Sequence, residues 1–275
     1  MRIVWTTDPH LNHVPLQAWD HWVAAIAAQA PDAVLVTGDI SEGDDVVFQL
    51  RRMVETFGVP LYFVLGNHDF YQSSIEQTRQ RVTVAADQHP LLNFLTGASP
   101  IRLGNGVYLM GEDGWGDAAQ GDYEGSPVRL NDFRLIEDFA SADPATWKYM
   151  LLDQGKQSAD RLQKQLQSVP SEASELIIAT HVPPFCEACW YEGHTTDQNW
   201  APFFVCGQAG DVLKRFADEN ATINLHVLCG HTHHDGIAKL ADNLTVYTGA
   251  AIYGQPDIEA NLEINAKTCT VDLLR

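Results

Sequence analysis

The chain has 275 residues, 45% of them hydrophobic, and this length lies near the upper limit for one hydrophobic core, so we expect a single folded domain over residues 1–275. It carries 17 Lys and Arg against 36 Asp and Glu, a formal net charge of -19, which argues against binding to a nucleic-acid polymer. No stretch approaches the roughly 20 apolar residues needed to cross a bilayer, so no membrane partner is expected. An odd number of cysteines and the absence of a signal-peptide pattern favour a cytoplasmic location.

Short apolar runs rich in Val, Ile and Leu alternate with helical patterns along the chain, which predicts an α/β layered fold. Because these runs lack polar alternation, we expect strands that are covered on both faces. The five runs are Ile3 to Thr7, Ala33 to Thr37, Leu61 to Leu65, Leu176 to Thr180 and Leu225 to Cys229.

Helix signals lie between these runs. Pro15 suits a first helical position, and the apolar stripe that follows it stops before Pro31. The stripe consists of Leu16, Trp19, Val23 and Ile26. Ser73 and Glu76 have the spacing of a capping box, which predicts a helix to about Val84. Further helices are predicted after the Asp143-Pro144 cap, from Gln157 to Gln167, and from about Ala209 to Glu219.

The other apolar segments have the pattern of antiparallel strands. Asn105-Gly106 is a strong hairpin signal between residues 101–103 and 107–110. Successive strands are also expected at Gly236 to Leu240, Leu244 to Thr248, Asn261 to Ile264 and Thr268 to Leu273. Two irregular stretches, residues 112–128 and 183–207, read as loop insertions, and long loops of this kind are usually functional or mobile.

Each of the five apolar runs is followed directly by residues that can bind a metal. In chain order these residues are Asp8, His10, Asp39, Asn67, His181, His231 and His233. Ligands of α/β sheets bind outside the carboxyl ends of the strands, where neighbouring loops converge. Taken singly, each piece also suits a capping Asp, a turn or a surface His. Five pieces in order, each at a strand end, predict one metal-binding crevice.

Imidazole and carboxylate donors suit first-row ions such as Mn, Fe and Zn. Seven donors are too many for one tetrahedral zinc but suit two ions that share a carboxylate, and Asp39 is the natural bridge. Two ions about 3.5–4 Å apart can hold a hydroxide between them for in-line attack on phosphorus. The donor set therefore predicts a two-metal phosphoesterase.

The ordered motifs resemble those of the calcineurin-like metallophosphoesterase family, whose pattern is D-x-H, G-D-x-x-D, G-N-H-(D/E), a lone His and G-x-H. The matching positions span Asp8 to His233. The resemblance implies an α/β fold, a four-layer α-β-β-α sandwich with two mixed β-sheets flanked by helices. It also implies two divalent or trivalent transition-metal ions, with Mn, Fe and Zn as the candidates.

The resemblance further implies a role for each site residue. One ion would be held by Asp8, His10 and His233, the other by Asn67, His181 and His231, and Asp39 would bridge them. His68 matches the catalytic His, as leaving-group acid or charge stabiliser. The carboxylate that pairs with it falls on Glu42, a departure from the Asp of the family, and Asp69 competes for that role.

The expected partner is a small-molecule phosphate ester. Resemblance to bacterial family members, together with His181-Val182-Pro183, slightly favours a phosphodiesterase acting on a cyclic nucleotide or nucleotide derivative. The alternatives are a phosphomonoesterase, a phosphoprotein phosphatase, which would need an open basic groove, and a non-catalytic scaffold. The sequence leaves the oligomeric state open.

The segment after His181 allows two further interpretations. Cys186, Cys189 and Cys206, with His194, could hold a structural zinc, although buried thiols are preferred. The segment also contains the aromatic residues Trp190, Tyr191, Trp200, Phe203 and Phe204. These aromatics form either a small packed subcore or a lid that stacks on a base or an aryl leaving group. Residues 112–128 are a candidate for the opposite wall, and Phe70 and Tyr71 are candidates for lining the pocket.

Overall fold

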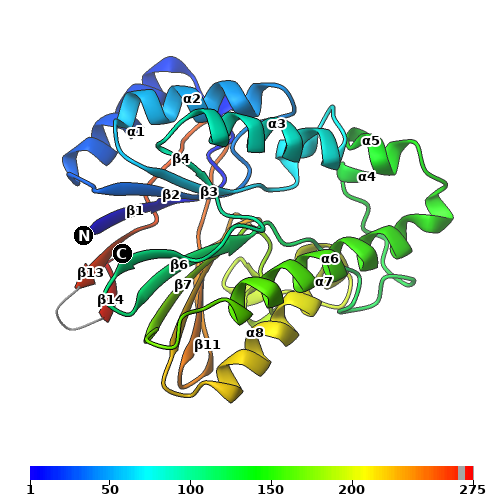
Figure 1. Cartoon of the computed structure of the whole chain (residues 1–275). Helices are drawn as coiled ribbons and strands as arrows, with labels where there is room; N and C mark the ends of the chain where they lie inside the picture. Colours follow the sequence, from blue (N-terminus) through cyan, green and yellow to red (C-terminus); the bar gives the residue numbers. More distant parts are fainter. Residues whose placement is uncertain (266–269, 275) are drawn as a thin grey trace.

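The computed structural model describes residues 1–265 and 270–274. Two six-stranded β-sheets lie face to face between layers of helices (Figure 1). The first sheet has the order β14 (Thr270–Leu274), β13 (Ala260–Asn265), β1 (Arg2–Thr6), β2 (Ala33–Thr37), β3 (Leu61–Val64) and β4 (Leu92–Phe94). Strands β1 to β4 are parallel, whereas β13 runs antiparallel to β1 and to β14.

The second sheet is also mixed. Its order is β11 (Gly236–Ala241), β12 (Leu244–Thr248), β10 (Asn224–Cys229), β7 (Glu175–Thr180), β6 (Val107–Glu112) and β5 (Ile101–Gly104). The four inner strands are parallel, and the two edge strands pair antiparallel with their neighbours. The predicted four-layer sandwich with two mixed sheets is confirmed.

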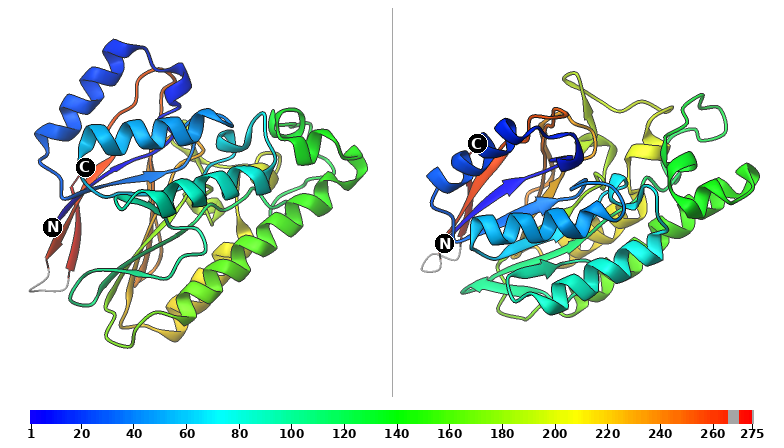
Figure 2. Two further views of the ribbon diagram at one scale, coloured as in Figure 1. Left: turned by 45° about the horizontal axis from the view of Figure 1, so that its top comes forward. Right: turned by 90° about the horizontal axis from the view of Figure 1, so that it is seen from above.

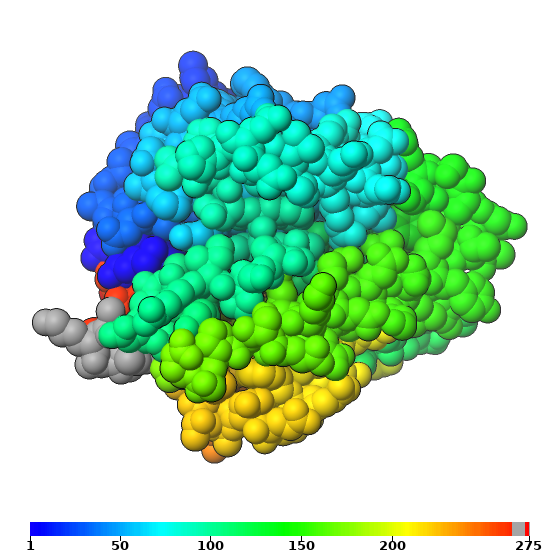
Figure 3. All heavy atoms as spheres, viewed as in Figure 1, coloured from blue at the N-terminus to red at the C-terminus, as the bar shows by residue number. Residues whose placement is uncertain are grey.

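A buried apolar layer fills the space between the two sheets. Trp5 and Leu35 of the first sheet and Leu109 and Ile177 of the second belong to it, and each is fully buried. These strands lack polar alternation because their other faces are covered by helices. The space-filling view shows the first-sheet half, in blue to cyan, packed directly on the green and yellow second-sheet half (Figure 3).

Helices cover the outer face of each sheet (Figure 2). Those over the first sheet are α1 (Leu16–Ala28), α2 (Asp45–Phe57) and α3 (Ile75–Gln88). Those over the second are α6 (Trp147–Gln167) and α8 (Gly207–Glu219). The loops contain α4 (Asp132–Leu135), α5 (Glu137–Ala140), α7 (Ala201–Phe204), the hairpin β8 (Trp190–Tyr191) and β9 (His194–Thr195), and the 3-10 turns η1 (Leu11–His13), η2 (His68–Phe70), η3 (Pro144–Thr146) and η4 (Cys186–Ala188).

Several helical expectations need correction. The cap of α3 is Ser74, whose side chain accepts a hydrogen bond from the Gln77 amide, and the predicted Ser73 cap is wrong. Helix α6 begins at residue 147 instead of 157. Gly155 weakens the helical pattern there, yet a Cβ at this position would lie 2.2 Å from Asp117 Cβ, so packing requires the glycine.

Other elements differ from the pattern-based expectation as well. Helix α2 was not predicted, although its buried face follows helical spacing. Strand β12 is not purely antiparallel, because it lies between β11 and β10 and pairs parallel with β10. Leu16 of the predicted stripe is exposed, and Trp22 takes its place in the core. Residues 268 and 269 of the last predicted strand lie outside the described residues.

Among the helices of the described residues, none combines the length and the apolar character that crossing a membrane requires.

Candidate metal centre

The predicted donors lie where parallel strands of both sheets end. Asp8 and His10 follow β1, Asp39 follows β2, and Asn67 follows β3. From the second sheet, His181 follows β7, and His231 and His233 follow β10. Because the sheets are stacked with these ends at the same side, the seven residues meet in one crevice, and the structure brings all of them together.

The first donor group combines Asp8, His10, Asp39 and His233, whose nearest ligand atoms all lie within 4.8 Å of one another. His10 Nε2 is 3.1 Å from His233 Nε2 and 3.7 Å from Asp39 Oδ2. His233 Nε2 is 3.4 Å from Asp8 Oδ1. Two imidazole nitrogens and two carboxylates therefore face a common point, which is the geometry that a small cation requires.

The second group surrounds His181. Its Nε2 lies 3.2 Å from Asn67 Oδ1 and 3.4 Å from Asp39 Oδ1. The His181 and His231 rings meet edge to face, with centroids 4.9 Å apart. Asp39 therefore directs Oδ2 toward the first group and Oδ1 toward the second, as a bridging carboxylate would.

Hydrogen bonds select which nitrogen of two histidines is available to a metal. His181 Nδ1 lies 2.9 Å from the Thr37 carbonyl oxygen, to which it must donate, so Nε2 carries the free lone pair. His231 is reversed, since its Nε2 donates to the Phe203 carbonyl at 3.2 Å and Nδ1 is left as the ligand atom. Buried His10 Nδ1 has no hydrogen-bond partner among the described residues.

Backbone strain concentrates at these donors. Five of the seven have a left-handed backbone: Asp8 (φ 45), His10 (φ 40), Asp39 (φ 50), His231 (φ 70) and His233 (φ 58). Such a conformation costs a non-glycine residue on the order of 1 kcal/mol or more, and it persists where the surrounding structure requires it. Five of the nine non-glycine residues with positive φ in the described part of the chain are predicted ligands, which supports a functional reason for the loop geometry.

Two glycines allow the donor loops to approach each other closely. A Cβ on Gly66 would lie 2.2 Å from Asp39 Oδ1, and one on Gly230 would lie 2.0 Å from Asp8 Oδ2. Any side chain at either position would displace a carboxylate of the crevice. The glycines of G-N-H and G-x-H are thus explained by space around the donors.

The electrostatics of the crevice suit a cation. Burial raises the pKa of Asp39 well above its ordinary value, and the nearby charge of Asp8 adds to this effect. For Asp8 burial also acts upward, but three surrounding histidines outweigh it and lower the pKa. Burial lowers the pKa of His10 to about 2 and that of His231 to about 3. Neutral imidazoles next to crowded carboxylates are ready ligands, so the residues fit the metal ions that the motifs imply.

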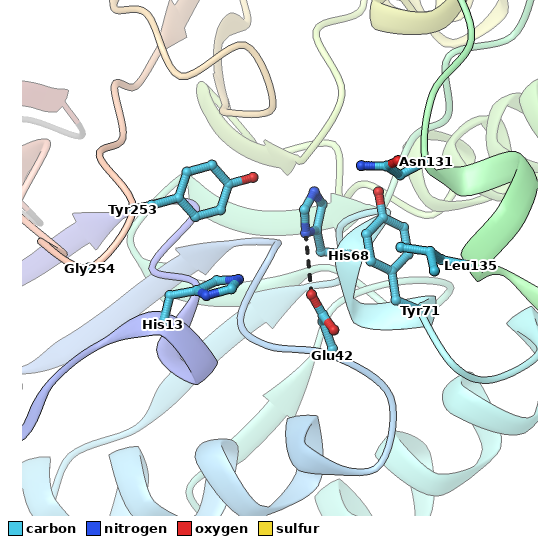
Figure 4. Close-up of a pocket in the computed structure, with 8 residues that line it drawn as sticks. All are labelled: His13, Glu42, His68, Tyr71, Asn131, Leu135, Tyr253 and Gly254. Carbon is cyan, nitrogen blue, oxygen red and sulfur yellow. Dashed lines mark ion pairs between the residues drawn. The ribbon is translucent and has the colours of Figure 1, made fainter.

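His68 lies at the edge of this centre on η2 (Figure 4). Its amide donates to Asp39 Oδ1 at 2.9 Å, and its Nδ1 is 4.0 Å from Glu42 Oε1. Burial, followed by the effect of His181, lowers the pKa of the His68 ring to about 3. Asp69 is fully buried and accepts hydrogen bonds from the Ser41 and Gly66 amides. Glu42 is therefore the carboxylate that faces the His68 ring.

A cavity of about 460 Å³ opens beside His68. Its lining consists of His13, Glu42, His68, Tyr71, Asn131, Leu135, Tyr253 and Gly254. Figure 4 shows the Tyr253 hydroxyl pointing toward His68 from one side and Tyr71 standing on the other. Tyr71 thus lines the cavity as expected, whereas Phe70 is buried in the core.

The residue that orients Asn67 has no recognisable signal in the sequence. Asn67 Nδ2 donates to Asp132 Oδ1 at 2.9 Å, and the Tyr71 hydroxyl donates to the same oxygen at 2.7 Å. Holding the amide nitrogen in this way turns Asn67 Oδ1 toward His181. Asp132 begins the four-residue helix α4, 65 residues further along the chain, and no periodicity marks it in the sequence.

Of the cysteine and aromatic residues that follow His181, some are buried in the core and others are exposed at the surface. Cys189 and Cys206 are buried, as preferred, and the described residues contain no donor group that includes a cysteine. Phe203 is buried against Tyr123, and Phe204 packs on His231 at 4.5 Å, whereas Tyr191 and Trp200 are exposed. Trp115 of the 112–128 segment belongs to the core and does not line the cavity.

The sandwich and its crevice of Asp, His and Asn donors define a class, the metal-dependent phosphoester hydrolases. Within that class, the chain belongs to the calcineurin-like phosphoesterases, whose family model matches residues 1–235. It is accordingly a phosphoester hydrolase of the binuclear metal-dependent type. No curated protein matches the sequence.

Many solved structures have similar folds. A phosphopantetheinyl hydrolase from Mycobacterium tuberculosis is 14% identical, with a TM-score of 0.65, and the match covers 93% of this chain and 94% of that one. A dimetal phosphatase from Danio rerio is 13% identical, with a TM-score of 0.58 and coverage of 95% and 92%. A protein from Thermus thermophilus is 14% identical, with a TM-score of 0.54 and coverage of 99% and 97%. At this identity the likeness concerns the fold.

Proposed function

We propose that this chain hydrolyses phosphate esters of small molecules at a centre of two transition-metal ions. One ion would bind Asp8, His10 and His233, the other would bind Asn67, His181 and His231, and Asp39 would bridge them. The observation that carries the proposal is the position of Asp39, with one carboxylate oxygen 3.7 Å from His10 Nε2 and the other 3.4 Å from His181 Nε2.

The donor chemistry points to Mn, Fe or Zn, because imidazole and carboxylate suit all three. When bound, such ions lower the pKa of a coordinated water and offset the negative charge of the phosphate. The protein would position that phosphate on the open side of the crevice, next to His68. Cytoplasmic location, and action of residues 1–275 as one domain, are parts of the same proposal.

His68 would assist departure of the alcohol. The ring is neutral in the metal-free protein, because burial lowers its pKa to about 3. To act as an acid it needs a partner that stabilises the imidazolium, and Glu42 at 4.0 Å from Nδ1 is placed for this. Without protonation, the ring can still stabilise charge as a hydrogen-bond donor. Asp69 would act indirectly, since its bonds to the Ser41 and Gly66 amides tie two donor loops together.

The cavity beside His68 supports a phosphodiester substrate. Its volume of about 460 Å³ is within the range of small-molecule sites, roughly 300–1,000 Å³. The aromatic side chains Tyr71 and Tyr253 suit the alcohol part of a cyclic nucleotide or a nucleotide derivative. A phosphomonoester carries a second negative charge, for which the lining offers no Lys or Arg, and it is the second candidate.

Two rival functions have less support. A phosphoprotein phosphatase would need basic residues around the crevice, and none of the eight residues lining the cavity is Lys or Arg. A non-catalytic scaffold could tolerate loss of a donor or of the catalytic His, whereas this chain has all seven donors and His68.

Metal analysis combined with an assay panel tests the proposal. The purified protein, loaded separately with Mn, Zn and Fe, should bind two ions and hydrolyse bis-p-nitrophenyl phosphate faster than p-nitrophenyl phosphate. The reverse order would favour the monoesterase. If protein that holds both ions hydrolyses neither ester, catalysis on small esters is contradicted. The same assay with phosphopeptides then separates the two rivals, because a phosphoprotein phosphatase would hydrolyse them and a non-catalytic scaffold would not.

A further inference from the structure

The eight residues that line the cavity beside His68 include one carboxylate, Glu42, and no Lys or Arg. Glu42 Oε1 lies 4.0 Å from His68 Nδ1, and 30% of the Glu42 side chain is exposed, so the charge faces the open space. Arg134 precedes Leu135 on α4 but does not line the cavity. A negative group on the substrate, away from the reacting phosphate, would meet the charge of Glu42, and the lining residues include no Lys or Arg to offset it.

Flat side chains form two walls of this cavity. The Tyr71 ring packs against His68, with centroids 4.3 Å apart, and its hydroxyl is held by Asp132 at 2.7 Å. The Tyr253 ring lies 4.3 Å from the His10 ring at an angle of 33°. Tyr71 is therefore rigid and buried, whereas Tyr253 is 49% exposed and presents a free face at the mouth of the crevice.

We propose that this cavity binds the alcohol part of the ester and selects alcohols that have a flat face and carry no negative charge. Glu42 excludes anionic alcohols, and Tyr253 recognises the flat face. Aryl alcohols and nucleosides meet both conditions, whereas alcohols with a second phosphate or a carboxylate do not. This inference rests on the proposed function, because it requires the reacting phosphate to lie at the metal centre.

The charge part can be tested with two aryl esters of methyl phosphate, the 4-(carbamoylmethyl)phenyl and 4-(carboxymethyl)phenyl esters, whose phenols have nearly equal acidity and which differ mainly in one negative charge. The kcat/KM ratio of the two is measured for the metal-loaded wild type and for Glu42→Gln, so that differences in intrinsic reactivity cancel. We expect the preference for the carbamoyl ester to fall about tenfold in Glu42→Gln. An unchanged ratio would overturn the charge part, and Arg134→Ala serves as a surface control that should not move it.

The flat-face part can be tested with two non-hydrolysable ligands of similar size, benzylphosphonate and cyclohexylmethylphosphonate. Their dissociation constants are measured by calorimetry on metal-loaded protein. Replacing the aromatic wall in Tyr253→Leu should reduce the preference for the benzyl compound by roughly fivefold, whereas Tyr253→Phe should retain it. Equal preferences in all three proteins would overturn the role of Tyr253.

These two measurements separate failure of the inference from failure of the proposed function. Hydrolysis of the esters with both ratios unmoved would refute the cavity assignment and leave the hydrolase intact. No hydrolysis, but a benzyl preference that depends on Tyr253, would refute the proposed function and leave the flat-face assignment standing.

Discussion

The two sheets contribute different chemistry to the crevice. The first sheet supplies every oxygen donor, through Asp8, Asp39 and Asn67, together with the nitrogen of His10. The second sheet supplies only nitrogen donors, His181, His231 and His233. The negative charge of the centre thus comes from one half of the molecule and its neutral ligands from both. Changes in the first sheet should therefore disturb the charge that both ions share, and changes in the second should disturb individual ligands.

The largest effect is expected from Asp39→Asn in the first sheet. Because Asp39 faces both donor groups, loss of its charge should weaken both ions. We expect kcat/KM to fall roughly 10⁴-fold, which corresponds to about 5 kcal/mol of barrier. Elemental analysis should show both ions depleted. Retention of two tightly bound ions would rule out the bridge.

His181→Ala in the second sheet should have a narrower effect. His181 contacts Asn67 and Asp39, while the group of Asp8, His10 and His233 stays complete. We expect the protein to keep one ion and to lose activity by roughly 10³-fold. Metal titration of the variant measures the remaining site. Loss of both ions would show that the two groups are not separable.

The approach of the loops can be tested with a matched pair of glycines. In Gly66→Ala the new methyl would meet Asp39 Oδ1 at 2.2 Å, and a displaced ligand should lower kcat/KM by about 10². Gly58 has φ 67 and nothing within 4 Å of the position that a Cβ would take, so Gly58→Ala should lower thermal stability through backbone strain without changing metal content. Equal metal loss in both variants would refute the steric explanation.

A smaller effect on metal affinity is expected from a change of Asp132, because Asp132 contacts the candidate donors only through Asn67. Asp132→Asn can turn a donor toward Asn67 Nδ2 and so release the amide that Asp132 now orients. Affinity for the ion at His181 should fall about tenfold, with the other ion unaffected. Tyr71→Phe removes the second hydrogen bond to Asp132 and the long one, 3.4 Å, from Asn67 Nδ2 to the Tyr71 hydroxyl. It leaves the bond between Asn67 and Asp132 in place and is therefore the control. Calorimetric metal titration of the metal-free proteins provides the measurement.

The smallest effect is expected in the pH dependence of metal affinity. Burial raises the pKa of Asp39 in the metal-free protein, and a hydrogen bond to Asp8 raises that of His233 although burial opposes it. Groups with a raised pKa hold protons that a cation must displace, so metal binding should release protons and affinity should fall as pH decreases. His10 and His231, with pKa values of about 2 and about 3, should contribute nothing near neutrality. Titration in buffers of different ionisation enthalpy measures the release, and heats independent of the buffer would contradict it.

The position of a site residue can be predicted from the sequence when its neighbours along the chain determine where it lies. That the seven candidate donors lie together was predictable, because each follows a buried apolar strand and the strand end determines where the side chain lies. The role of Asp132 could not be predicted, because its contact with Asn67 links segments 65 residues apart and depends on the fold of an irregular loop. Tyr253 was missed for the same reason, since it follows β12 in a stretch without regular structure. The roles of Glu42 and Asp69 became distinct only through their partners, the His68 ring and two backbone amides.

The segment that carries Tyr253 connects the two sheets. Residues 249–259 cross from β12 of the second sheet to β13 of the first. The Gly249 amide donates a hydrogen bond to the Cys229 carbonyl at one end, and the Glu259 amide donates one to the Trp5 carbonyl at the other, so the crossing is anchored to both sheets. Any change in the spacing of the two sheets must therefore shift this crossing relative to His68. If Tyr253 contacts the substrate as proposed, we expect a methyl group gained or lost in the layer between the sheets, well away from the crevice, to alter substrate preference without changing any of the seven candidate ligands.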